Sequence, residues 1–253
     1  MSGLRVLLGK ELREQWRTRR LLIVAIVFLM FGIASPLLAR YLPQIVEALG
    51  SSQLQIRVPE PTGRDAVDQF LKNMGQVGVL TAILLAMGSV ANEKERGTAA
   101  SVLASPASRA AFLVAKLAAI FGTLLVSVAC ASAAAYTYTT LLFAPPNVPG
   151  WIGMTLLLLL SLLAYAGLTF LGSTLFRSAP AAAGIGVAGL VVLAAVSALP
   201  SVARYTPGGL SGVAAALANG TDAGDVIGSV VANVALVIAL GAVAWVAFRR
   251  QEL

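Results

Sequence analysis

Six long apolar runs constrain this chain more than any other feature of its sequence. The runs cover residues 21–38, 77–91, 112–136, 152–176, 180–199 and 226–248. About 20 consecutive apolar residues allow a helix to cross the hydrocarbon core of a bilayer, where each backbone polar group must be satisfied within its own segment. Only 11% of the residues are charged, against about 25% in an ordinary soluble domain. The pattern predicts an all-α integral membrane protein, a single transmembrane domain over residues 1–253 with six transmembrane helices.

The distribution of basic residues predicts the orientation of these helices. With the N-terminus inside, thirteen of the 18 Lys and Arg residues fall in inside segments and five fall outside. Loops on the cytoplasmic side of a membrane carry an excess of Lys and Arg. We therefore expect both termini to be cytoplasmic, and the first run to be retained as a span rather than cleaved as a signal peptide. The net charge of +7 is explained by this asymmetry, without a nucleic-acid partner.

Several kinds of chemistry are excluded by the residues that are absent. The chain has no histidine, and its single cysteine, Cys130, lies in the third run, so neither a disulfide framework nor a Cys-based metal site is expected. Gly9-Lys10 is followed by Glu11 rather than Ser or Thr, which departs from the phosphate-binding loop of nucleotide-binding proteins. We expect no catalytic residue, no metal site and no cofactor in this chain.

Residues 1–20 have the periodicity of an amphipathic helix. Apolar residues share one face: Leu4, Leu7, Leu8, Leu12 and Trp16. Trp and basic side chains are favoured at a membrane interface, so the predicted interfacial residues are Trp16, Arg17, Arg19 and Arg20. The alternative is a plain cytosolic extension of the first span.

Two outer segments are longer than simple connections. Residues 39–74 include a Thr62-x-x-Asp65 capping signal, which predicts a short helix over 65–74 leading into the second span. This segment could contact a substrate or an outer partner, or serve as a structural lid. Residues 200–225 contain a short apolar helix over 210–217, too short to span, which we expect to be re-entrant or interfacial.

A cluster of charged residues separates the second and third runs, within residues 92–110. It reads Glu93-Lys94-Glu95-Arg96, and Gly97 and Thr98 then provide a chain break and an N-cap. The alanine-rich residues 99–104 favour a short helix that Ser105-Pro106 ends. The segment is typical of a cytoplasmic loop that presents a small rigid helix.

Few polar residues lie within the runs, and none near their centres is charged. Tyr136, Tyr165 and Asn233 are the candidates for a substrate path. Interfacial anchoring and helix–helix hydrogen bonds are the alternative uses of such residues. Uncharged spans favour a lipophilic or amphipathic cargo. The small residues of 181–189, such as Gly184 and Ala188, could form a subunit interface or an intrachain contact.

Three segments belong together: the basic amphipathic start at residues 10–20, the Glu93-Lys-Glu-Arg-Gly-Thr98 loop with Ser105-Pro106, and Thr206-Pro207 before the last run. In these segments the chain resembles an ABC-2-type permease, the membrane subunit of an ATP-binding-cassette exporter. The resemblance implies an elbow helix at the N-terminus, a cytoplasmic coupling helix between spans two and three, and a re-entrant outer segment before span six. It also implies an ATPase-coupling surface comprising Glu93, Glu95, Arg96, Gly97 and Thr98.

The resemblance further implies the partners and the location. Two copies of a separate ATPase subunit would hold ATP and Mg, and a second permease copy, identical or related, would complete the exporter in the cell membrane among its lipids. Three alternatives remain: a solvated loop without a coupling role, a non-transporting structural or regulatory subunit, and an intramembrane lipid-modifying enzyme. The last would need a cluster of acidic or histidine residues near the interface, and none with useful spacing is present.

Overall fold

The computed structural model describes residues 2–49, 60–97 and 109–251, and every regular element in these ranges is helical. Six helices or helix runs are long and apolar enough to cross a membrane. The helices are α1 Ser2–Arg17, α2 Arg20–Leu49, α3 Gly63–Asn73, α4 Val79–Met87, α5 Ala91–Glu95, α7 Arg109–Leu142, α8 Val148–Leu175, α9 Ala179–Ser197, α10 Leu210–Ala218 and α11 Val226–Arg249. A π-helical turn η1, Met74–Gly78, and a 3-10 turn η2, Ala203–Tyr205, complete them. The protein is a multi-pass membrane protein.

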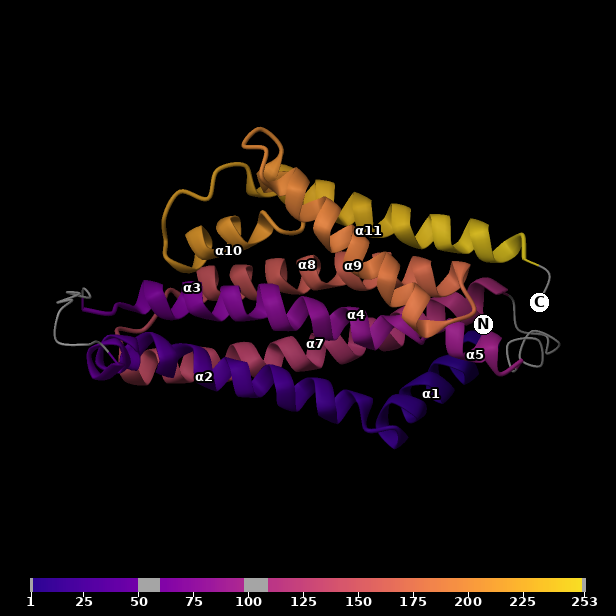
Figure 1. The fold of residues 1–253 in the computed structure, drawn as a ribbon, viewed down its shortest axis with the longest axis horizontal. Coiled ribbons are helices and arrows are strands. Elements are labelled where there is room, and N and C mark those ends of the chain that lie inside the picture. The colour runs from indigo at the N-terminus through magenta and orange to yellow at the C-terminus, as the bar shows by residue number, and fades with distance from the viewer. Residues whose placement is uncertain (1, 50–59, 98–108, 252–253) are drawn as a thin grey trace.

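The spans form an elongated bundle with two distinct ends (Figure 1). Helices α1 and α5 and the C-terminal end of α11 lie at one end, which we call the terminal end. The start of α3 and helix α10 lie toward the other, which we call the distal end. Helix α8 runs through the bundle and packs against α4, α9, α10 and α11.

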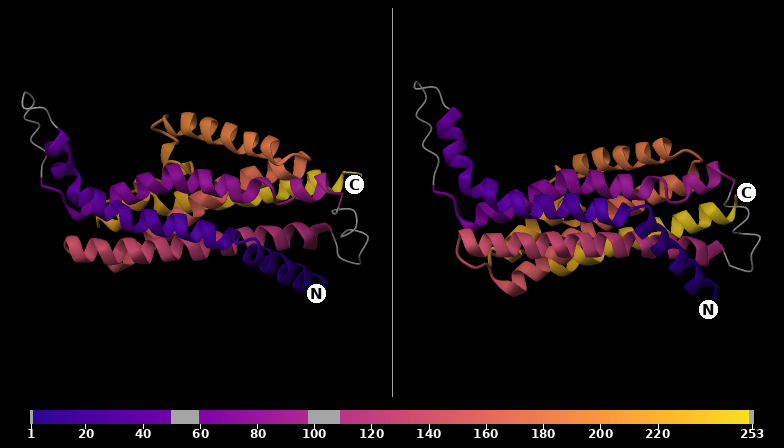
Figure 2. Two further views of the ribbon diagram at one scale, coloured as in Figure 1. Left: turned by 60° about the horizontal axis from the view of Figure 1, so that its bottom comes forward. Right: turned by 90° about the horizontal axis from the view of Figure 1, so that it is seen from below.

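The N-terminal helix leaves the bundle axis, as both views in Figure 2 show. The bend lies between α1 and α2, where Arg19 adopts a φ of 57°. A non-glycine residue rarely takes this left-handed conformation, so the chain changes direction sharply at this residue. Helix α1 packs against α7 on one side and is exposed on the other.

The second span is continuous with the short helix predicted before it. Asp65 accepts a hydrogen bond from the backbone N–H of Thr62 at 2.7 Å, which is the capping interaction that the sequence indicated. Helix α3 then passes through η1 into α4 without a break. A single π turn inside a helical span is rare and is often found at a functional site.

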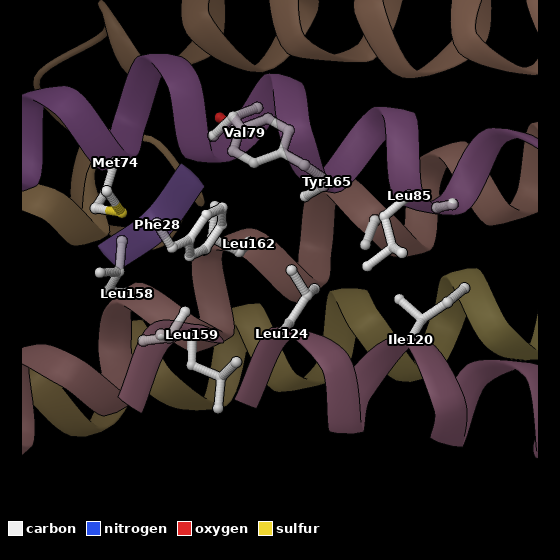
Figure 3. Close-up of a cluster of buried hydrophobic side chains, with 14 of the residues drawn as sticks. Phe28, Met74, Val79, Leu85, Ile120, Leu124, Leu158, Leu159, Leu162 and Tyr165 are labelled. Carbon is white, nitrogen blue, oxygen red and sulfur yellow. The ribbon is translucent and has the colours of Figure 1, made fainter. Parts of the chain in front are cut away.

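Close helix contacts build the core (Figure 3). Helices α2 and α7 pair along most of their length, and a Cβ added at Gly32 would overlap the carbonyl oxygen of Ala131. Phe28, Leu124 and Leu162 are fully buried where α2, α7 and α8 meet. Because a glycine lets two helices approach closely, the α2–α7 pair forms a tight wall of the bundle.

Two helices extend beyond the apolar runs that predicted them. Helix α2 continues through Pro36 and Pro43 to Leu49, and α7 has 34 residues, about 50 Å at 1.5 Å per residue. The predicted helix over 210–217 is present as α10, which lies along α8. The helix predicted over 99–104 and its N-cap Thr98 lie outside the described residues.

Candidate functional site

A compact group of charged side chains joins three helices at the terminal end. The Lys116 ammonium lies 2.9 Å from Glu93 Oε1 and 3.1 Å from Glu11 Oε1. Lys10 Nζ also lies 3.1 Å from Glu93 Oε1. We call Lys10, Glu11, Glu93 and Lys116 the charge cluster. It connects α1, which carries Lys10 and Glu11, to α5 and α7.

The cluster is largely withdrawn from solvent. The Lys116 side chain is 3% exposed and those of Glu11 and Glu93 are 9% and 14% exposed, whereas that of Lys10 is 44% exposed. Burial by itself lowers the pKa of Lys10, but the carboxylates of Glu93 and Glu11 outweigh this effect and raise its pKa above the ordinary value. Lys116 therefore supplies most of the buried positive charge, and Lys10 closes the cluster toward solvent.

The helical register of α1 directs Glu11 inward. Leu7, Glu11 and Gln15 are buried and are spaced four residues apart, so they share one helix face. The face that meets the bundle is thus partly polar, while Leu4 and Leu12, expected on the apolar face, are exposed. The predicted interfacial residues Trp16, Arg17 and Arg19 are exposed and Arg20 is half-buried.

Helix α5 is held to α8 by Ser173 and by Lys94. Ser173 Oγ accepts hydrogen bonds from the backbone N–H groups of Val90 and Ala91 at 3.0 and 2.9 Å. Ser173 is fully buried, and buried donors left without an acceptor are costly. The Lys94 ammonium also donates to the Thr174 carbonyl oxygen, so α5 is held to the end of α8 at two places.

The C-terminal residues are held at the same end. Arg109 donates to the carbonyl oxygens of Arg249 and Gln251 at 2.9 and 3.0 Å. Gln251 Nε2 in turn donates to the Thr174 carbonyl oxygen at 2.9 Å. The starts of α5 and α7 and the ends of α8 and α11 thus form one connected region.

The residues predicted to form the coupling surface are divided between two environments. Glu93 points into the charge cluster, whereas Glu95, Arg96 and Gly97 are exposed. Gly97 has a φ of 69°, a conformation that glycine adopts without steric cost, and it ends α5. Thr98 lies outside the described residues. Helix α5 therefore presents an exposed surface while its inner side contacts α1, α7 and α8.

Three functional candidates were not found from the sequence. Glu11 was not singled out, Lys116 was counted only among the basic residues of the inside loop, and Ser173 was not considered. The nearest signal was Lys116 itself, a charged residue inside an otherwise apolar run, since such a residue usually has a charged partner. Its partners are 105 and 23 positions away, so their identity needed the structure.

The three candidates for a substrate path lie in different surroundings. Tyr136 packs edge-on against Trp151, with ring centroids 5.4 Å apart. Asn233 is fully buried and donates to the carbonyl oxygens of Tyr205 and Ser229, so it ties α11 to η2. Tyr165 lines a cavity between α4, α8 and α9. The structure does not bring these three side chains together.

Comparisons with known proteins identify the family. The model of the ABC-2 family transporter protein matches residues 5–207. The chain is also 30% identical over 213 residues to the uncharacterized transmembrane protein YxlG of Bacillus subtilis (strain 168), an alignment that covers 82% of this chain and 81% of YxlG. The match includes α1, the charge cluster and spans one to five. This chain therefore belongs to the ABC-2 transporter family, whose members are transport components rather than enzymes.

Proposed function

We propose that this chain forms the export pathway of an ABC transporter and is driven by a separate ATPase subunit that docks on α5 and the residues following it. The observation that carries the proposal is the two-sided character of α5. Glu95 and Arg96 are exposed, while Glu93, two residues before Glu95 and thus on the opposite face of the helix, is held in the charge cluster. Exposed charges fix the register of a protein interface, and a rigid element behind them can transmit a displacement.

The contacts behind α5 define what a displacement would move. Glu93 is paired with Lys116 of α7, and Lys116 is also paired with Glu11 of α1. Removing one member of a buried ion pair costs about 3–5 kcal/mol, so these helices favour moving together with α5. Ser173 adds α8 to the same group. A force on α5 would therefore reach three parts of the bundle directly.

The family and the charge distribution support the remaining features of the proposed transporter. Two ATPase subunits would bind ATP and Mg, and two copies of this chain would form a homodimer in the cell membrane. The terminal end would face the cytoplasm, which the excess of Lys and Arg supports. Gly184 and Ala188 lie exposed on α9, which supports α9 as a surface for the second copy.

Charge reversal on the exposed side of α5 tests the proposal. The tagged chain is purified in mild detergent from its native host, and any co-purifying ATPase is quantified by mass spectrometry and by ATP hydrolysis. We expect Arg96→Glu to reduce the bound ATPase by roughly tenfold or more while thermal unfolding stays unchanged. Arg250→Glu is the matched control, because Arg250 is exposed at the same end outside α5.

Two results would contradict the proposal. If no ATPase accompanies the unaltered chain, the non-transporting subunit becomes the better interpretation. If Arg96→Glu and Arg250→Glu release the ATPase equally, α5 has no special role in docking. Glu93 is not suitable for this test, since its change would disturb the charge cluster as well as the surface.

A further inference from the structure

A cavity of about 580 Å³ lies in the distal half of the bundle. It extends along the second span from Asp68 of α3, past η1, to Val79 of α4, and is closed by α8, α9 and α10. Eleven residues of helix correspond to about 16 Å, so the cavity is elongated. Its inner walls are mainly aliphatic: Leu71, Met74, Val79, Leu158, Leu162 and Leu190. A site of this size and lining suits an organic molecule with a long apolar part.

One polar group inside the cavity has no partner. Tyr165 is 3% exposed and lies in the buried cluster that Figure 3 shows, and a Cβ added at Gly208 would lie 3.6 Å from its hydroxyl. The hydroxyl makes no hydrogen bond with the described residues. Ser161, by contrast, donates to the Pro207 carbonyl oxygen at 2.8 Å. The Tyr165 hydroxyl therefore opens into the cavity without a protein partner and can bond a ligand that carries a polar atom.

The outer rim of the cavity carries one charge of each sign. Asp68 and Lys72 line it and lie four residues apart on α3, which places them on the same helix face. Neither forms an ion pair within 4 Å among the residues that the structure describes. Both charges are therefore available to a ligand whose head contains a cation and an anion.

We propose that this cavity binds a zwitterionic single-chain phospholipid as the cargo class, an assignment that rests on the proposed function. The phosphate pairs with Lys72, the ammonium group pairs with Asp68, and the Tyr165 hydroxyl donates to an oxygen of the linkage between head and chain. The hydrocarbon chain fills the aliphatic part of the cavity. This arrangement gives partners to Asp68, Lys72 and Tyr165 and keeps the charged head at the rim.

Two glycines of the lining allow the cavity to be blocked without crowding the fold. A Cβ added at Gly75 of η1 or at Gly212 of α10 meets no atom within 4 Å, and both residues line the cavity. Gly75→Leu and Gly212→Leu therefore add a side chain at two lining positions, one on η1 and one on α10, without overlapping the surrounding atoms. Gly122 of α7 has the same open surroundings but lies outside the cavity, so Gly122→Leu is the matched control.

Equilibrium binding to the purified full chain in an amphipathic polymer tests the site. The probe is a single-chain phosphatidylcholine, and a monoacylglycerol of the same chain length serves as the uncharged comparison. We expect each of Gly75→Leu and Gly212→Leu to weaken binding by roughly tenfold or more, and Tyr165→Phe to weaken it roughly fivefold. Lys72→Gln is expected to cause a loss of up to about fivefold. Thermal unfolding of each variant separates a blocked cavity from an altered fold.

The outcomes separate this inference from the proposed function. If Gly75→Leu, Gly212→Leu and Gly122→Leu weaken phospholipid binding equally, the cavity is not the binding site. If monoacylglycerol binds as tightly as the phosphatidylcholine, the assignment of a zwitterionic head is wrong. Either result leaves ATPase docking on α5 untouched. Loss of docking with intact phospholipid binding would overturn the proposed function and leave the binding site in place.

Discussion

Two buried side chains, Lys116 at the terminal end and Tyr165 in the distal half, differ in the partners that the protein supplies to them. At the terminal end, the buried ammonium of Lys116 faces two carboxylates within 3.1 Å. In the distal half, the equally buried Tyr165 has a hydroxyl with no partner among the described residues. A satisfied cluster contributes to a defined arrangement of helices, whereas a hydroxyl that opens into a cavity without a protein partner remains available to a ligand. The comparison indicates that the charge cluster holds helices together at the terminal end, whereas the distal cavity has room for a ligand.

Removing the buried ammonium group of Lys116 should have the largest effect on stability. Lys116→Met leaves Glu11 and Glu93 buried without it, and we expect a loss of about 3–5 kcal/mol in the free energy of unfolding. Chemical denaturation in detergent micelles measures this loss. The triple variant Lys116→Met/Glu11→Gln/Glu93→Gln should recover most of it, because no buried charge then remains unpaired. A triple variant as unstable as the single one would show that packing, not charge, dominates the cluster.

Ser173→Ala should have the next largest effect. It removes the acceptor for the backbone N–H groups of Val90 and Ala91, and each unsatisfied buried donor costs about 1–3 kcal/mol. We expect faster hydrogen exchange at residues 90 and 91 as well as lower stability. Ser211→Ala is the control, because Ser211 bonds only to a carbonyl of its own turn in an exposed position. Equal exchange in both variants would mean that Ser173 does not hold α5.

Gly150→Ala tests how rigidly the distal end is built. An added Cβ would overlap the carbonyl oxygen of Leu217, so α8 and α10 would have to separate, at a cost of about 1–3 kcal/mol. Gly122→Ala meets no neighbour and should instead stabilise its helix by roughly 0.5–1 kcal/mol. Paired thermal unfolding curves measure both. Similar unfolding midpoints for the two variants would show that α10 can be displaced from α8 at little cost in stability.

Tyr165→Phe should have the smallest effect on stability. Because the hydroxyl has no partner in the described part of the chain, its removal should change the free energy of unfolding by less than about 0.5 kcal/mol. The same variant is expected to weaken phospholipid binding, so stability and binding should separate at this residue. A loss of more than about 1 kcal/mol would mean that the hydroxyl has a structural role, and the contrast between the two ends would disappear.

The sequence predicted the number of spans well because hydropathy is a local property. Each apolar run must satisfy its own backbone, so its neighbours along the chain suffice to identify it. The capping interaction of Thr62 and Asp65 was predicted for the same reason, since it lies within one helical turn. The extension of α2 to Leu49 was not predicted, because the apolar run ends at residue 38 and the following residues include Arg40 and Pro43. Helix α2 continues there beside α7, and Arg40 lies over the ring of Phe143.

The charge cluster could not be predicted, because it depends on which residues meet across the bundle. Lys116 had the sequence signature of an inside loop residue, and Glu93 that of an exposed one. Their pairing joins helices that the sequence places far apart. The cavity beside Tyr165 has the same origin, since its walls come from four separate segments. Local patterns therefore identified the charged segment 93–96, but they did not predict helix α5 over Ala91–Glu95 or distinguish its buried face from its exposed one.

The order of the charged residues along the chain has a consequence for biosynthesis. Translation begins at the N-terminus, so the helices that carry Glu11 and Glu93 are complete before Lys116 is made. An unpaired lysine opposes membrane insertion by about 2.5–3.5 kcal/mol at the centre of a span and by less near its start, where Lys116 lies in α7. Both carboxylates are made before α7, so Lys116 can pair with them as α7 is inserted. The first half of the protein can thus assemble its charged contacts without the second half.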